Sequence, residues 1–470
     1  SPINRLGVWF ITKMINIFYN QRLTDIWTCY KLFPAKEGKF LDDGGFAPEI
    51  LFTIHLIENN YRIKEVPISY NPRTVQEGKK IKYKDGFLAI YLILKKICID
   101  IYKDIGGYIL KLFIITRVPL AIIGVIAMLL FDPIMLHDWR MALSDHSILL
   151  RIWAVWDSEW YLKIAEYGYQ IPLPFDPNVY SSIGFFPLYS IFIYLVSFLT
   201  NNFLLSGIIV SNISFIIGLY IFYKLLRLDY EEDFSRKVLK YFILWPTAFI
   251  FSAVYAESLF FFLAVLCIYF ARKDKWWLAG VAGFFLTLTK VFGILIIPVL
   301  LCIYAKKINW KWKSMNLDFI WTIFPATGAF LFGVYSYLLV GDFFAYSHVQ
   351  QLSWGHSYTN PLPVLWNTLS YGWESALSSL SLILALALLL GYFRKLKMEY
   401  SLYTLLLVLF VPATGVIWGA PRYLSIVFPL SIIIAFIADT KKKDTQLTIL
   451  LSIVQIILMY IWVQSSALTV

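Results

Sequence analysis

The sequence predicts a mainly α-helical membrane protein with about 10–12 transmembrane helices, because apolar runs recur along most of the chain. Of its 470 residues, 59% are hydrophobic and 15% are charged, whereas soluble domains carry about 25% charged residues. A hydrocarbon core about 30 Å thick needs roughly 20 apolar residues for each helical crossing. Aromatic residues make up 18% of the chain, which fits belts of Trp and Tyr at the two membrane surfaces.

The charge pattern argues against a nucleic-acid partner. The net charge is +11, but the basic residues form short clusters between apolar segments, as in cytoplasmic loops that meet anionic lipid headgroups. The cysteines have neither metal-site nor disulfide spacing, so we expect no metal centre in this chain. Because the sequence opens on Ser1-Pro2 without Met, we expect the natural start to lie upstream.

Residues 1–104 are more polar than the rest and predict a partial α/β segment on the cytoplasmic face. Apolar positions recur at helical spacing in 6–19 and 86–103, which suits helices lying in the membrane interface. Residues 63–70 alternate like a strand, and Asn71-Pro72 ends it.

Residues 105–470 predict the membrane domain. If its apolar segments cross alternately, the basic clusters all fall on one side, which is therefore cytoplasmic. The loops 132–184, 251–257, 341–375 and 412–421 then share the outer face. Residues 185–199 do not fit this alternation and predict a re-entrant or interfacial helix. The predicted crossings are 110–131, 203–224, 238–250, 252–271, 277–289, 291–305, 318–340, 376–393, 399–411, 422–438 and 445–463.

The first outer loop contains an acid among aromatic residues, Trp156-Asp157-Ser-Glu-Trp160-Tyr161. A partly desolvated carboxylate can serve as a general base, and the aromatic faces of Trp156, Trp160 and Tyr161 suit the apolar faces of sugar rings. The alternative is an interfacial loop that these aromatic residues anchor, with solvated acids. The spacing supports both interpretations equally.

Two more charged residues lie at outer-face helix ends. Glu257 follows Tyr255 at the start of an apolar segment, where an acid is by default a functional candidate, although a helix dipole also favours it there. Tyr255 is a candidate sugar contact. Lys290 can bind a phosphate or extend to the headgroups.

The last outer loop places Arg422 at the start of an apolar segment. Its guanidinium offers a fork for phosphate oxygens, or it marks the headgroup level. His348 and His356 flank Trp354 in the preceding loop, and we expect both to be incidental.

Several motifs resemble the PIG-V family, the GPI second-mannosyltransferases and their prokaryotic relatives, over most of residues 110–465. They are Trp156-Asp157 through Tyr169, Phe185-Phe186-Pro187-Leu188-Tyr189, Trp245-Pro246, Tyr255-Ala-Glu257-Ser258 and Pro421-Arg422-Tyr423-Leu424.

This resemblance implies a membrane glycosyltransferase of the GT-C fold in the plasma membrane of a prokaryote. The donor would be a polyprenyl (dolichyl) phosphate sugar, mannose above all, and the acceptor a lipid, glycan or protein on the outer face. By likeness, Asp157 is the base of an inverting reaction, with Glu257 as a second catalytic candidate. Arg422 and Lys290 are candidates for the donor phosphate.

Residues 1–104 resemble the C-terminal part of family 2 polyprenyl-phosphate glycosyltransferases such as dolichol-phosphate mannose synthase. The matching segments are 23–31, 46–50, 65–70, 73–74 and 77–81. The resemblance implies that Arg73, Lys79 and Lys80 lie near a lipid phosphate or sugar diphosphate.

This second resemblance has two departures. Ala47 stands where the family suggests Glu, and the half that binds nucleotide and metal does not precede Ser1. We therefore expect Mg or Mn, and polyprenyl-phosphate sugar synthesis, only in a complete family 2 domain, and expect this chain to be the C-terminal part of a fusion.

Two other functions remain open from the sequence. A lipid-linked sugar flippase or transporter is also polytopic, but should show internal repeats and polar groups at mid-membrane depth. A non-catalytic scaffold leaves the Trp156-Asp157 loop without a role.

Overall fold

The computed structural model confirms a mainly α-helical, polytopic membrane protein. Helices account for 74% of the residues that the structure describes, and this part of the chain contains no strand. The predicted strand at 63–70 is therefore wrong over residues 63–67, and its remainder lies outside the described residues. The described residues are 2–19, 21–26, 31–40, 47–59, 61–67, 90–91, 93, 105–131, 146–171, 174–465 and 468.

The chain divides into two compact units, Ser1–Tyr108 and Ile109–Val470. In the first unit, α1 (Pro2–Phe18) confirms the predicted helix at 6–19, and η1 (Ala35–Phe40) and α2 (Ala47–Glu58) follow it. The predicted helix at 86–103 lies almost wholly outside the described residues.

Isoleucines spaced four apart form the core of this first unit. Ile11 and Ile15 of α1 are buried in one apolar cluster with Ile50 and Ile54 of α2. Residues four apart lie on one face of a helix, so this spacing lets the two helices share a core.

Among its described residues, the second unit contains four helices that are long and apolar enough to cross a membrane. They are α4 (Gly107–Leu130), α9 (Phe203–Leu226), α18 (Trp373–Tyr392) with the turn that follows it, and α22 (Lys441–Val463). Two bent pairs raise the number to six if each is one span. The predicted 10–12 crossings stay a prediction.

The bent pairs differ from the straight crossings predicted from the sequence. α15 (Ala326–Val340) meets α16 (Ala345–Leu352) at 82°. The segment Ala420–Ile426, which includes α20 (Ala420–Tyr423), meets α21 (Pro429–Ile437) at 88°. The predicted crossing at 422–438 falls on this bent pair, so it is wrong as one continuous helix.

The predicted crossing at 238–250 is also wrong. α10 (Glu232–Ile243) ends before Pro246, and a short 3-10 helix, η4 (Ala248–Ser252), follows. Proline has no backbone N–H and cannot continue a helical ladder. The segment 185–199 forms α8 (Leu188–Thr200), an apolar helix of 13 residues.

Other short elements of the second unit are α6 (Ile148–Arg151), η3 (Ser182–Gly184), α14 (Asp318–Ile323), α17 (Pro361–Asn367) and η7 (Thr368–Ser370).

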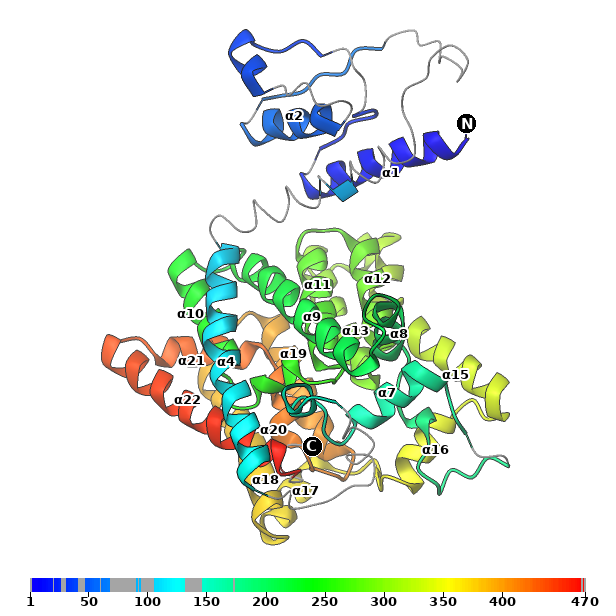
Figure 1. Ribbon diagram of the computed structural model, residues 1–470, viewed down its shortest axis with the longest axis vertical. Helices are drawn as coiled ribbons and strands as arrows, with labels where there is room; N and C mark the ends of the chain where they lie inside the picture. Colours follow the sequence, from blue (N-terminus) through cyan, green and yellow to red (C-terminus); the bar gives the residue numbers. More distant parts are fainter. Residues whose placement is uncertain are drawn as a thin grey trace. The chain divides into compact units, whose positions relative to one another are not determined.

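The centre of the second unit is the pair α9 and α11 (Glu257–Arg272), which lie side by side in Figure 1. Gly218 of α9 lies so close to Phe261 of α11 that a Cβ there would be 2.8 Å from the ring. Phe215 stacks on Phe251 at 4.6 Å. This close packing fixes the start of α11, where Glu257 lies.

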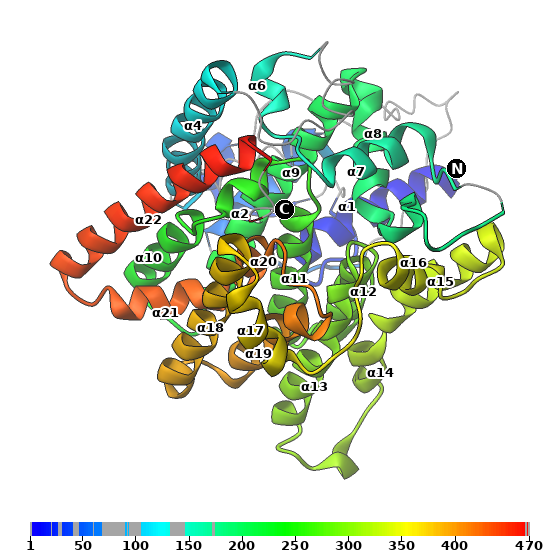
Figure 2. The ribbon, with the colours of Figure 1, turned by 90° about the horizontal axis from the view of Figure 1, so that it is seen from below.

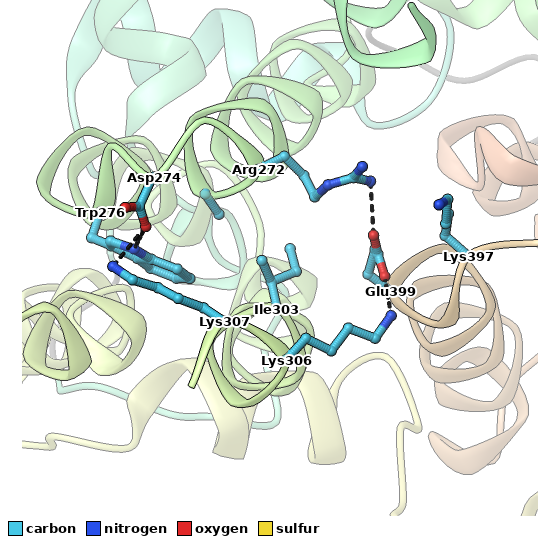
Figure 3. A pocket seen from close by; sticks show the side chains of 9 residues that line it. Arg272, Asp274, Trp276, Ile303, Lys306, Lys307, Lys397 and Glu399 are labelled. Atoms are coloured by element: carbon cyan, nitrogen blue, oxygen red, sulfur yellow. Dashed lines mark hydrogen bonds and ion pairs between the residues drawn. The ribbon is translucent and has the colours of Figure 1, made fainter. Parts of the chain in front are cut away.

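The other end of α11 contributes to a charged cluster that joins several helix ends. α12 (Trp276–Thr287), α13 (Ile296–Lys307) and α19 (Met398–Ala413) meet α11 here. Glu399 accepts a hydrogen bond from Arg272 at 2.8 Å and one from Lys306 at 2.6 Å, beside a cavity of about 420 Å³. Figure 3 shows these three side chains around the cavity. Arg272 also binds Asp229 at 2.7 Å. Because each cation here has an acidic partner, we interpret the cluster as a structural link between helices.

Candidate active site

Backbone and hydroxyl hydrogen bonds hold two segments of the second unit together, Trp153–Asp157 and Val254–Tyr255. The Val254 N–H donates to Trp153 O at 2.9 Å. The Tyr255 hydroxyl donates to Val155 O at 2.9 Å and accepts the Asp157 N–H at 3.1 Å. These contacts fix the Asp157 loop against the start of α11.

The Trp245-Pro246 segment ties α20 into the same assembly. The Thr247 hydroxyl donates to Pro421 O at 2.7 Å, and Gln455 donates to Trp245 O at 2.9 Å. α20 also packs against α18 and α19, which gather around it with α17 in Figure 2. Arg422 is therefore carried by a short helix that is held on several sides.

The backbone turns sharply just before Asp157. Trp156 has a φ of 51°, in the left-handed region that a bulky residue rarely adopts. Strain of this kind gathers at functional sites, where the surrounding structure maintains it. Asp157 then precedes α7 (Ser158–Tyr167), but its side chain makes no capping hydrogen bond to that helix.

The carboxylate of Asp157 instead begins a chain of alternating charges. Asp157 Oδ2 lies 2.9 Å from Arg422 Nη1, and Arg422 Nε lies 3.5 Å from Glu257 Oε1. That same Glu257 oxygen accepts Lys290 Nζ at 2.6 Å. The structure thus brings together all four charged residues predicted for the site, from segments far apart in the sequence.

The four side chains differ in exposure, and this difference limits the role that each can have. The exposed fraction of the side chain is 24% for Asp157, 13% for Lys290, 3% for Arg422 and 0% for Glu257. Asp157 is therefore the acid that a solute can reach. Glu257 is enclosed and fixes two cations, and its direct catalytic role stays a prediction.

Tyrosine rings surround the two cations. The Arg422 guanidinium lies 4.9 Å from the Tyr255 ring and 4.6 Å from the Tyr423 ring. Lys290 Nζ lies 5.3 Å from the Tyr423 ring, and Arg422 Nη2 donates to the Tyr423 hydroxyl at 2.8 Å. Such contacts stabilise a cation as it loses water.

The four predicted sugar contacts fall into two pairs. Tyr161 and Tyr255 are buried and pack against one another, with ring centroids 6.4 Å apart. They support the site from within, whereas Trp156 and Trp160 are half-buried and stay candidates for contact with a sugar. Trp160 stacks on Phe185 at 5.7 Å.

The loop after α16 also belongs to this region, which the sequence did not indicate. Trp354 contacts Trp160 edge-on at 6.0 Å, and the Ser357 N–H donates to Thr414 O at 2.7 Å. Burial holds the pKa of His356 below its usual value, and the charge of Asp157 acts in the opposite direction. The expectation that His356 is incidental stays a prediction. His348 instead pairs with Asp342 at 2.6 Å.

The structure does not describe the three remaining candidates. Arg73, Lys79 and Lys80 are outside the described residues. Among the residues that the structure describes, no three His, Cys, Asp or Glu side chains are arranged to hold a metal ion.

One comparison with known proteins gives a match. Residues 105–316 match a family model described as mannosyltransferase (PIG-V). This range contains Asp157, Glu257 and Lys290, whereas Arg422 lies beyond it. No curated protein and no solved structure matches the chain. The match and the long apolar helices support a membrane mannosyltransferase, and over residues 105–316 the chain is similar to the mannosyltransferase (PIG-V) family.

Proposed function

We propose that this protein transfers a mannosyl residue from a polyprenyl phosphate to an acceptor hydroxyl on the outer face of a membrane. The observation that carries the proposal is the charge chain Asp157–Arg422–Glu257–Lys290. In this chain a reachable carboxylate contacts Arg422, and Glu257 links Arg422 to Lys290, on a protein whose residues 105–316 match a mannosyltransferase family. A base and a phosphate site are the two groups that this reaction needs.

In the proposed reaction, Asp157 takes the proton of the acceptor hydroxyl. The acceptor oxygen forms a bond to the anomeric carbon while the bond from that carbon to the phosphate oxygen breaks. The electron pair of this bond leaves with the polyprenyl phosphate, whose growing charge Arg422 and Lys290 stabilise. A single displacement from the face opposite the phosphate inverts the anomeric carbon.

Glu257 acts in this proposal as a positioning residue. Its carboxylate is enclosed, and it holds Lys290 at 2.6 Å and lies 3.5 Å from Arg422. A fixed carboxylate keeps both cations in place before the donor arrives, so less reorganisation is needed during the reaction. Trp156 and Trp160 are the proposed contacts of the sugar or acceptor.

The proposal also gives the first unit a role on the cytoplasmic side. Residues 1–104 are proposed to be the end of a family 2 glycosyltransferase, in which Arg73, Lys79 and Lys80 bind phosphate. A complete domain of this kind makes the lipid-linked sugar that the membrane domain is proposed to use, in the plasma membrane of a prokaryote. The basic clusters of the second unit predict which of its sides is cytoplasmic.

The bent helices favour a second candidate function, a flippase for lipid-linked sugars. Transporters bind substrates at breaks in their helices, and Arg422 lies in the segment that bends by 88° toward α21.

Proteoliposomes separate the two candidates. The purified full chain is supplied with polyprenyl-phosphate mannose labelled in the sugar, a membrane extract as the acceptor source, and labelled GDP-mannose in a parallel sample. We expect label to pass from polyprenyl-phosphate mannose to a new product and none from GDP-mannose. Movement of intact labelled donor between leaflets without a new product would instead favour the flippase.

A further inference from the structure

The candidate base and the candidate phosphate ligand are bound to one another. Asp157 Oδ2 lies 2.9 Å from Arg422 Nη1, and the Arg422 side chain is only 3% exposed. While this contact lasts, Asp157 Oδ2 faces the guanidinium instead of an acceptor hydroxyl. That carboxylate oxygen is therefore not free to reach an acceptor as long as Arg422 holds it.

Arg422 has other partners that do not depend on Asp157. Its Nη2 donates to the Tyr423 hydroxyl at 2.8 Å, and its guanidinium faces the Tyr255 and Tyr423 rings. Glu257 Oε1 lies 3.5 Å from its Nε. The guanidinium thus stays in place if its contact with Asp157 breaks.

Two buried polar atoms beside this contact lack hydrogen-bond partners. They are Arg422 Nε and Glu257 Oε2, and neither has a hydrogen-bond partner within the described part of the chain. Buried polar atoms are nearly always paired, so the unpaired donor Arg422 Nε points to a missing acceptor, whereas Glu257 Oε2 is itself an acceptor and does not bind a phosphate oxygen. A guanidinium has five N–H donors in a fork that matches phosphate oxygens, so Arg422 can accept such a ligand.

We propose that the donor phosphate and Asp157 compete for Arg422, so that donor binding releases Asp157 to act as the base. This inference rests on the proposed function. In the exchange, the Asp157–Arg422 ion pair breaks and a phosphate–Arg422 ion pair forms, without any covalent change. The acceptor hydroxyl is then deprotonated only when a donor is in place, so acceptor deprotonation is coupled to donor binding.

The same exchange accounts for release of the product. After transfer, Asp157 carries the acceptor proton and is neutral, so it no longer competes for Arg422. The polyprenyl phosphate that leaves carries more negative charge than the donor and stays on Arg422. When Asp157 gives its proton to water, its carboxylate again competes for Arg422 and so assists the departure of the product.

Binding measurements on the purified full chain in lipid nanodiscs test this competition. The probe is a short-chain polyprenyl phosphate, and the corresponding polyprenol without phosphate is the control ligand. We expect Asp157→Asn to bind the phosphate about three- to tenfold more tightly than the wild type, because the competing charge is gone. Glu159→Gln is the matched control, because Glu159 pairs with Lys163 on the same helix, and its affinity should equal that of the wild type.

A double-mutant cycle separates competition for Arg422 from general repulsion between Asp157 and the phosphate. In an Arg422→Gln background, Asp157→Asn should leave the affinity unchanged. Arg422→Lys, which keeps the charge but not the fork, is the background to use if Arg422→Gln does not fold. Equal tightening in wild-type and Arg422-substituted backgrounds would overturn the competition.

Two further results bear on the proposal differently. If Asp157→Asn loses transfer but binds the phosphate no more tightly than the wild type, the competition is wrong and the proposed function stands. If the wild type binds polyprenol and polyprenyl phosphate equally, both the competition and the proposed phosphate site are wrong.

Discussion

Asp157→Asn is expected to lower the rate of mannosyl transfer by about 10²–10⁴-fold, the range typical of a lost general base. Asparagine has nearly the same size as aspartate but cannot take a proton from the acceptor hydroxyl. The initial rate with saturating labelled donor in proteoliposomes measures the effect. At a saturating donor concentration, differences in donor binding do not affect the rate, so the measurement reports the chemical step.

Glu159→Gln is the control for this prediction. Glu159 lies two residues away, at the start of α7, and contacts Lys163 rather than Arg422. Its rate should stay within about twofold of the wild type, as expected for a partly exposed pair. An Asp157→Asn rate within tenfold of the wild type would contradict the assignment of the base.

Glu399→Ala is expected to cause the largest loss of stability among the acids of the second unit, about 2–4 kcal/mol in the free energy of unfolding. Its carboxylate is 4% exposed and accepts both Arg272 and Lys306. Removing it leaves two cations at the meeting point of α11, α13 and α19 without this partner. Because Arg272 keeps Asp229 at 2.7 Å, the loss should be smaller than for a wholly unpaired charge.

Thermal unfolding in detergent measures this effect as a shift of the midpoint. Glu232→Ala is the matched variant, because Glu232 pairs with Arg236 at 2.6 Å on the exposed side of α10. Exposed pairs of this kind contribute about 0.3–0.5 kcal/mol. Equal midpoint shifts for the two variants would show that the Glu399 cluster does not link the helices.

The long helices could be predicted from the sequence because each is a continuous apolar run. α4, α9 and α22 begin and end within a few residues of the predicted segments 110–131, 203–224 and 445–463. The failures lie where apolar composition continues across a break in the helix. Pro246 follows the end of α10, and Pro429 begins α21 after the 88° bend. A prediction from hydrophobicity alone therefore treated two separate helical segments as one crossing.

The members of the candidate site could be predicted, but their pairing could not. Asp157 was notable as an acid among aromatic residues, and Glu257, Lys290 and Arg422 as charges at the ends of apolar segments. Asp157 and Arg422 are 265 positions apart, and nothing in a single sequence indicates that these two side chains meet. His356 has no motif around it, and it is linked to the site only by the way its loop packs onto Trp160 and Thr414.

Only some predictions for the first unit fall on residues that the structure describes. The interface helix at 6–19 is present as α1, because its apolar spacing is local information. The phosphate-binding stretch from Arg73 to Lys80 lies outside the described residues, and its role stays a proposal.

The anomeric configuration of the product tests the central claim most directly, namely that Asp157 serves as a base in one direct displacement at a polyprenyl phosphate. The wild-type protein is given polyprenyl-phosphate mannose of known configuration, and the glycosidic linkage of the product is determined by NMR. Our account predicts inversion at the anomeric carbon. Retention would contradict it, because retention requires a second displacement that a general base at Asp157 does not provide.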